Sequence, residues 1–148
     1  MSDTTEKNKP AVRFNWVGLA VTDLERSRRF YEGLLGFSFK RDLKPPDEGT
    51  SKICRVPEPC NLTAVYLVLD GFTLELLHWD REGNPPSAPH PMNQPGFTHL
   101  SLTVDDLPAV VAKAPDYGGT VLEETNVGAA ICLLDPDGQV VELLAARS

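Results

Sequence analysis

Glu75, His99 and Glu142 are the side chains whose types and settings are suited to chemistry. Carboxylates and imidazoles transfer protons as general acids and bases, and they also coordinate divalent metals. Each glutamate stands inside a short apolar run that is typical of a strand, at residues 72–79 and 139–145. Because an isolated buried charge costs several kcal/mol, each carboxylate needs a partner or a solvent-filled cleft. These residues therefore predict polar sites on otherwise apolar strands.

An internal repeat relates the two glutamates. Residues 14–24 align without gaps on residues 97–107, at an offset of 83 (97 − 14). Residues 70–77 align on residues 137–144, at an offset of 67 (137 − 70), so that Glu75 matches Glu142. A repeat constrains architecture more firmly than local propensity does, because each copy must form the same unit. The chain is therefore predicted to consist of two similar modules.

The first copy is longer than the second by 16 residues (83 − 67). We place this excess in residues 44–60, where four prolines predict a long loop of variable function. Residues 80–96 contain five prolines and are predicted to form a stiff, extended connector between the copies. We accordingly expect module 1 at residues 13–80, a connector at residues 81–96 and module 2 at residues 97–146, within one domain that spans residues 13–148.

Each copy is predicted to begin with a strand, continue with a helix and end with three strands. Thr22 and Glu25 have the spacing of a capping box, and Gly36 suits the position just after a helix. In the second copy, Pro108 fits the first helical turn and Gly118 fits the helix end. The later strands are expected at residues 37–41, 63–69, 72–79, 120–124, 129–134 and 139–145.

Strand parity predicts where the chemically suited residues point. Val17, Leu19 and Val21 form one apolar face of the first strand, and Leu100, Leu102 and Val104 form the matching face of its repeat. This face is expected to cover the helix. The opposite face then carries Trp16, Gly18 and Ala20 in module 1, and His99, Ser101 and Thr103 in module 2. Two curved sheets with these faces turned inward would bring positions 16, 75, 99 and 142 to one cavity.

Three motifs give the chain a resemblance to a known family. Residues 21–37 read V-x-D-L-x-x-S-x-x-F-Y-x-x-x-L-G-F, residues 95–100 read P-G-F-T-H-L, and residues 135–143 read D-P-x-G-x-x-x-E-L. Together they resemble the vicinal oxygen chelate superfamily, which includes glyoxalase, bleomycin-resistance and extradiol-dioxygenase proteins. The resemblance extends from Phe14 to Ala145. It implies an α+β fold in which two βαβββ modules form a curved, barrel-like mixed sheet.

The same resemblance implies a metal site on the first and last strands of each module. The matching positions are Trp16, Glu75, His99 and Glu142, and Trp16 departs from the family pattern because an indole N–H cannot ligate a metal. Glu75, His99 and Glu142 remain as expected ligands of zinc, manganese, magnesium or nickel. Glu142 or Glu75 is the expected catalytic base. Trp16 and Ser101 are expected to line the substrate cavity.

The leading functional prediction is a glyoxalase-like lyase or isomerase, with a divalent metal, acting on a small substrate with adjacent oxygen atoms. It would remove a carbon-bound proton and stabilise the resulting enediolate. The alternative is a metal-free protein that binds or sequesters a planar small molecule on Trp16, as bleomycin-resistance proteins do with antibiotics. An extradiol-type dioxygenase is a third prediction, weakened by the tryptophan at the first ligand position.

Structural roles compete with each of these functional roles. His99 could be a hydrogen-bonded core histidine, the two glutamates could form salt bridges at a sheet edge or dimer interface, and Trp16 could be a core aromatic. His78 is expected on the opposite strand face from Glu75. His90 in the connector is a possible substitute ligand, and Cys132 is expected to be a small buried hydrophobic residue.

Composition limits the partners. Twenty-one acidic against 14 basic residues give a net charge of −7, which disfavours nucleic acid. No apolar run approaches the roughly 20 residues of a membrane-spanning helix, so no membrane partner is expected. Residues 1–12 are polar, are predicted to form a flexible tail and resemble no targeting segment, and three cysteines without paired spacing suit a reducing cytoplasm. The family resemblance implies a homodimer.

Overall fold

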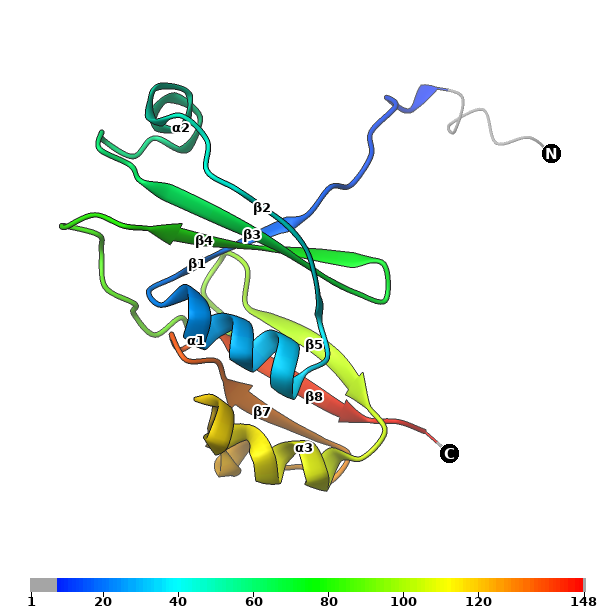
Figure 1. The fold of residues 1–148 in the computed structure, drawn as a ribbon. Helices are drawn as coiled ribbons and strands as arrows, with labels where there is room; N and C mark the ends of the chain where they lie inside the picture. Colours follow the sequence, from blue (N-terminus) through cyan, green and yellow to red (C-terminus); the bar gives the residue numbers. More distant parts are fainter. Residues whose placement is uncertain (1–7, 148) are drawn as a thin grey trace.

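A computed structural model describes residues 8–147, and residues 1–7 of the predicted tail lie outside the described part. Two modules follow each other along the chain, each with a strand, a helical segment and three further strands (Figure 1). The strands of module 1 are β1 (Val17–Val21), β2 (Ser38–Leu43), β3 (Leu62–Leu69) and β4 (Phe72–Trp79). Those of module 2 are β5 (His99–Val104), β6 (Thr120–Leu122), β7 (Ala130–Leu134) and β8 (Val140–Ala145).

Each module forms its own mixed four-stranded sheet. The strand orders are β1-β4-β3-β2 and β5-β8-β7-β6, with the first and last strands of each module parallel and the other pairs antiparallel. Gly18 pairs in register with Glu75, and Ser101 pairs with Glu142. These two pairs are equivalent in the repeat. The predicted α+β fold of two βαβββ modules is therefore confirmed.

The helix of module 1 begins one residue later than the capping-box spacing predicts. Asp23, not Thr22, caps α1 (Leu24–Arg28), because its carboxylate accepts a hydrogen bond from the Arg26 amide at 3.0 Å. The helix continues as a π-helical turn, η2 (Arg29–Leu34). Gly36 follows with a φ of 83°, a conformation that favours glycine, as predicted.

Residues 44–60 are not simply a loop, which corrects the sequence prediction. They contain α2 (Asp47–Cys54), whose first turn carries Asp47 and Glu48. Acidic residues stabilise the positive end of a helix dipole, and the Asp47 carboxylate also accepts bonds from the backbone amides of Cys60 and Asn61 at 3.1 Å each. The prolines lie on either side of this helix. Residues 44–60 therefore form an ordered helical segment between β2 and β3.

Module 2 differs from its predicted elements at one strand. Its helix α3 (Leu107–Lys113), with the short turn η3 (Ala114–Tyr117), is followed by a β6 of only three residues. The predicted strand at residues 120–124 ends early because residues 123–125 form a 3-10 turn, η4 (Glu123–Thr125). The Thr125 hydroxyl closes this turn on the Leu122 carbonyl at 2.6 Å.

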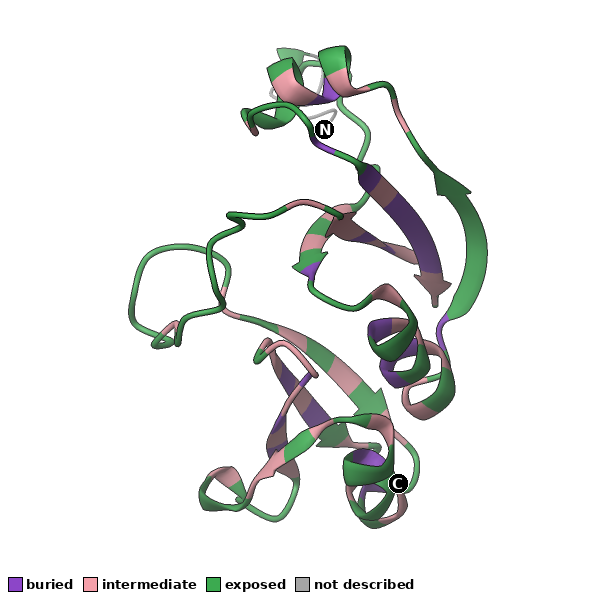
Figure 2. Ribbon diagram, turned by 60° about the vertical axis from the view of Figure 1, so that its left-hand side comes forward, coloured by how far each residue is buried: buried purple, intermediate pink, exposed green. Residues whose placement is uncertain are grey.

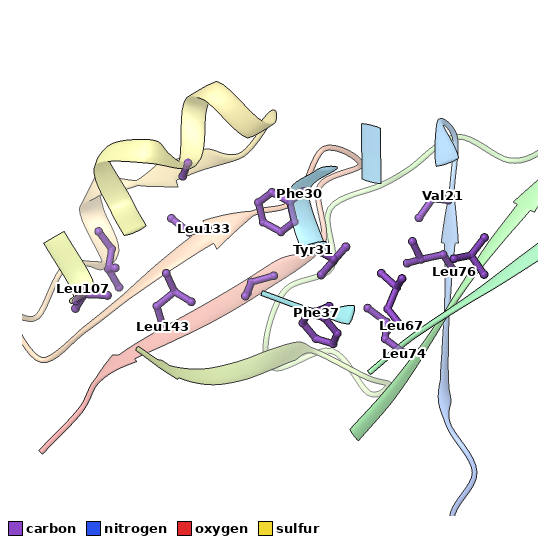
Figure 3. Packing of buried hydrophobic residues seen from close by; sticks show 14 residues of the cluster. Val21, Phe30, Tyr31, Phe37, Leu67, Leu74, Leu76, Leu107, Leu133 and Leu143 are labelled. Carbon is purple, nitrogen blue, oxygen red and sulfur yellow. The ribbon is translucent and has the colours of Figure 1, made fainter. Parts of the chain in front are cut away.

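One hydrophobic core joins the modules. Phe30 and Tyr31 of η2 lie between the buried face of the first sheet and that of the second (Figure 3). Both aromatic residues are fully buried, as are Leu74 of β4 and Leu143 of β8. The helix-side strand faces thus meet through η2, which leaves the opposite face of each sheet for other contacts.

Polar contacts also connect the modules. The Tyr31 hydroxyl donates a hydrogen bond of 2.7 Å to the buried carboxylate of Asp135, just after β7. At the start of α1, the amide of Thr22 donates to Asp137 at 3.1 Å, and Arg26 bonds the same carboxylate at 3.2 Å. These bonds fix the turn between β7 and β8 against the beginning of the first helix.

The connector between Trp79 and His99 contains no helix or strand and is largely exposed (Figure 2). Within residues 8–147, no helix is long and apolar enough to cross a membrane.

Candidate active site

In each sheet, the strand face that does not pack against a helix carries the residues that strand parity predicts there. Burial alternates along β1 and β5, so Gly18 and Ala20 are exposed while Val17 and Leu19 are half-buried. In β5, His99, Ser101 and Thr103 are exposed and the intervening apolar residues are half-buried. Trp16, just before β1, is 39% exposed. The predicted division of these strands into a core face and an open face is confirmed.

Module 2 assembles a polar group around Glu142. The Ser101 hydroxyl donates a hydrogen bond of 2.8 Å to Oε1 of Glu142, and Nε2 of His99 lies 3.9 Å from the same oxygen. Thr98 places its hydroxyl 2.8 Å from Nδ1 of His99. A chain of contacts thus runs from Thr98 through His99 to Glu142 and Ser101, on a strand face where the His99 and Glu142 side chains are 31% and 33% exposed.

The direction of the hydrogen bond between Thr98 and His99 is linked to the tautomer of His99. If the threonine hydroxyl donates to Nδ1, the ring proton of neutral His99 resides on Nε2, the nitrogen that is nearer Glu142. Sequence reasoning did not select Thr98, although it directly precedes His99. Alternation gives Thr98 the same parity as Leu100, on the core face, so nothing in the sequence marked it as a contact of His99.

In module 1, aromatic and basic side chains surround the equivalent open face. Trp16 packs edge-on against Tyr66, with ring centroids 5.0 Å apart, and the guanidinium of Arg41 lies 4.1 Å from the centre of the Tyr66 ring. Burial, and then the neighbouring Glu75 carboxylate, raise the pKa of Tyr66 to about 12. The Tyr66 hydroxyl therefore stays protonated, on the residue that pairs in register with Glu75. Sequence reasoning missed Tyr66 and Arg41 because it examined only the first and last strands of each module.

The three predicted metal ligands do not come together in one chain. His99 and Glu142 are neighbours in module 2, whereas Glu75 lies in the separate sheet of module 1. In the part of the chain that the structure describes, no three His, Cys, Asp or Glu side chains form a group able to hold a metal ion. Trp16 has no free lone pair to supply a donor. The donor types fit a divalent metal, but their arrangement within one chain does not.

Three other residues were considered from the sequence: His78, His90 and Cys132. His78 is on β4, with Nδ1 at 3.4 Å from the Val21 carbonyl oxygen, and His90 is in the connector. Cys132 pairs in register with Glu142 and is half-buried, so it is less enclosed than expected. Burial and then the Glu142 carboxylate raise the pKa of this thiol, which keeps it protonated. Cys132 therefore lies next to Glu142 on the neighbouring strand and is not activated as a nucleophile.

Comparison with known proteins identifies relatives over nearly the whole chain. The sequence model of the Glyoxalase/Bleomycin resistance protein/Dioxygenase superfamily matches residues 15–146. The mitochondrial methylmalonyl-CoA epimerase of Bos taurus is 29% identical over 139 residues, covering 88% of this chain and 73% of the relative. An ethylmalonyl-CoA/methylmalonyl-CoA epimerase of Cereibacter sphaeroides is also 29% identical, over 140 residues, covering 88% of this chain and 96% of the relative.

Solved structures show the same fold. A glyoxalase family protein from Bacillus cereus superposes with a TM-score of 0.77 at 16% identity, covering 93% of this chain and 96% of that protein. Identity at this level supports the architecture alone. The agreement extends over both modules.

Proposed function

Since the chain belongs to the Glyoxalase/Bleomycin resistance protein/Dioxygenase superfamily, we propose that it is a small-molecule isomerase or lyase of the glyoxalase and epimerase type. It would remove a proton from a carbon atom next to a carbonyl group. The observation that supports this proposal most directly is the Glu142 carboxylate, held by Ser101 and placed beside His99 on an open strand face. The epimerase names of two relatives agree with this type of reaction.

Glu142 is the proposed general base. One carboxylate oxygen takes the proton from the substrate carbon, and the electron pair of that C–H bond moves into the carbonyl group to form an enolate or enediolate. Protonation of that carbon on its other face, by an acid other than Glu142, gives an epimer, and delivery of the proton from Glu142 to the adjacent carbon gives an isomer. The Ser101 hydroxyl holds the carboxylate in place by donating to Oε1.

His99 is the proposed electrophilic partner. With its ring proton on Nε2, it can donate a hydrogen bond to the oxygen that becomes negative as the enolate forms. This tautomer requires the Thr98 hydroxyl to donate to Nδ1, which the 2.8 Å contact permits. Glu75 remains an alternative base, and Tyr66 is its register partner on the neighbouring strand.

Superfamily members often use divalent metals, and we retain a metal site of Glu75, His99 and Glu142 as a proposal with one condition. Since one chain does not bring Glu75 to the other two residues, a second copy of the chain would have to supply it. A bound metal would stabilise the negative oxygen of the enediolate. The proton transfers described above rest on protein side chains.

This condition gives a testable expectation. Zinc or manganese binding, measured by elemental analysis of fractions from size-exclusion chromatography with light scattering, should be confined to a dimer and be lost in Glu75→Gln. Asp70→Asn, which also removes a module 1 carboxylate, serves as the control. A monomer that carries one equivalent of metal, or a dimer that keeps it after Glu75→Gln, would show that this ligand set is wrong.

Hydrogen exchange at carbon tests the proposed reaction whichever product is formed. The chain is incubated in D₂O with a panel of 2-methyl-branched thioesters, 2-hydroxy ketones and hemithioacetals, with methylmalonyl-CoA included because two relatives are named for it. Loss of the carbon-bound proton is followed by NMR against a sample without protein. We expect catalysed exchange of at least one member, and a panel that exchanges only at the spontaneous rate would contradict the proposal.

The second candidate function is a metal-free binding protein. It is favoured by the aromatic pair Trp16 and Tyr66 with Arg41 against the tyrosine ring, an arrangement suited to a planar ligand. Ring cleavage by an iron dioxygenase receives less support, because the four repeat-related positions supply one histidine and not the two of the usual iron triad. Catalysed exchange of a carbon-bound proton separates the enzyme from the binding protein.

A further inference from the structure

A cavity of about 940 Å³ lies where the two modules and the connector meet. The ends of β1 and β4, the segment after α2, the connector, the start of β5 and the turn between β7 and β8 all contribute to its wall. Its volume is within the range of about 300–1,000 Å³ that is typical of small-molecule sites. Neither Glu75 nor Glu142 lines it, so the proposed reaction does not account for it.

The side chains around this cavity favour a negatively charged ligand. Its basic residues are Arg55, Arg81, His78 and His90. Within residues 8–147, the Arg55 guanidinium makes no hydrogen bond or ion pair, whereas Arg81 donates from Nε to the Pro59 carbonyl at 3.0 Å. Of these four residues, the two arginines carry a permanent positive charge, in a chain whose net charge is −7.

Acidic groups offset the charge of the two arginines only in part. Asp137 lines the cavity, but Arg26 and the backbone and hydroxyl groups of Thr22 already bind its carboxylate. Asp80 is the other acidic residue in the wall. With both arginines charged, the arginine positive charge thus exceeds the negative charge that remains without a partner.

A histidine nitrogen in the wall lacks a partner. Nδ1 of His90 is buried and makes no hydrogen bond, although buried polar atoms are nearly always paired. The ring lies against Gly96, where an added Cβ would come within 3.1 Å of Nε2. Gly96 therefore leaves room for the His90 ring, because a larger residue at this position would crowd it.

We propose that this cavity binds a small molecule through a carboxylate or phosphate group, contacted by Arg55, Arg81 and His90. The cavity also reaches Thr98 and Val140, and Val140 is the register partner of His99. The ligand is therefore either the anionic end of the substrate or a separate molecule bound next to His99. The proposal does not depend on the reaction at Glu142, because the cavity and its charges are independent of it.

Binding of two simple anions tests the site. Inorganic phosphate and malonate are titrated into the full chain by calorimetry at fixed ionic strength, with uncharged malonamide as the matched probe. We expect saturable binding of at least one anion, an affinity about tenfold lower in Arg55→Gln, and unchanged affinity in Arg13→Gln, an exposed arginine outside the cavity. The ring signals of His90, assigned with His90→Gln, should shift in NMR spectra during the titration.

Three results would overturn the proposal: no saturable binding of either anion, equal binding by Arg55→Gln and Arg13→Gln, or malonamide binding as tightly as malonate. Thermal unfolding of each variant confirms that it is folded. The exchange assay then identifies the source of the anion. A raised KM with unchanged kcat in Arg55→Gln shows that the anion belongs to the substrate, and unchanged values with lost anion binding show a separate ligand. If no substrate exchanges, the proposed function fails while the calorimetry still decides this proposal.

Discussion

Glu142→Gln is expected to lower the rate of carbon-bound proton exchange by about 10²–10⁴-fold, the usual contribution of a positioned general base. Glutamine keeps the size of the side chain, and its carbonyl oxygen can still accept the bond from Ser101. The amide cannot take up the substrate proton. The rate is measured as loss of the NMR signal in D₂O at saturating substrate, so that a change in affinity does not obscure the chemical step.

Two further variants distinguish the role of the Glu142 carboxylate from the roles of Ser101 and Glu75. Ser101→Ala removes only the hydrogen bond to the carboxylate and should lower the rate by about tenfold. Glu75→Gln makes the same chemical change at the equivalent position of module 1 and should have a smaller effect than Glu142→Gln. Equal losses would make both carboxylates part of the reaction. A loss in Glu75→Gln alone would transfer the role of base to module 1.

The internal repeat explains why so much of the fold could be predicted from sequence. Aligning Glu75 with Glu142 fixed the order of elements in both modules, and alternation along β1 and β5 gave the correct core and open faces. Both signals reflect a physical requirement, because one face of each sheet must cover its helix. The register pairs Gly18–Glu75 and Ser101–Glu142 then follow from placing similar strands at similar positions.

Contacts with other segments of the chain explain two of the elements that were mispredicted. Thr22 and Asp23 are both good helix caps, and the contact of Thr22 with Asp137 of module 2 leaves Asp23 to cap the helix. In residues 44–60, the prolines suggested a loop, but Asp47 begins a helix and also binds the amides of Cys60 and Asn61. Both outcomes depend on contacts between residues distant in sequence.

The arrangement of the candidate site was the hardest feature to predict. Parity placed Glu75 and Glu142 on open faces, but it contains no information on how one module lies relative to the other. That relation depends on the packing of Phe30 and Tyr31 between the sheets. The sequence therefore predicted which face of each module carries the candidate residues. Only the structure shows that Glu75 does not join His99 and Glu142 within one chain.

The buried bond between Tyr31 and Asp135 gives the largest expected effect on stability. The Asp135 carboxylate, 2% exposed, accepts hydrogen bonds from the Tyr31 hydroxyl at 2.7 Å and from the amides of Asp137 and Gln139 at 2.9 and 2.8 Å. Asp135→Ala removes the partner of all three donors and should lower the free energy of unfolding by about 3–5 kcal/mol. Tyr31→Phe removes one donor and should cost about 1.5–3 kcal/mol. Urea unfolding measures both, and equal losses would mean that the two amides do not need the carboxylate.

The pH dependence of stability provides a second measurement on Asp135. Burial, only partly opposed by the bonds from Tyr31 and the two amides, raises the pKa of this carboxyl above its ordinary value of 3.8. Between 3.8 and the higher pKa of the folded state, the folded chain binds more protons than the unfolded chain, so protonation favours folding. The contribution of this group is complete below pH 3.8 and is lost as the pH rises through the folded-state pKa. The unfolding free energy of the parent, relative to that of the non-titrating Asp135→Asn, should therefore decrease with rising pH across this interval. A difference that instead increases with pH would show that the hydrogen bonds outweigh burial and that the pKa of Asp135 is lowered.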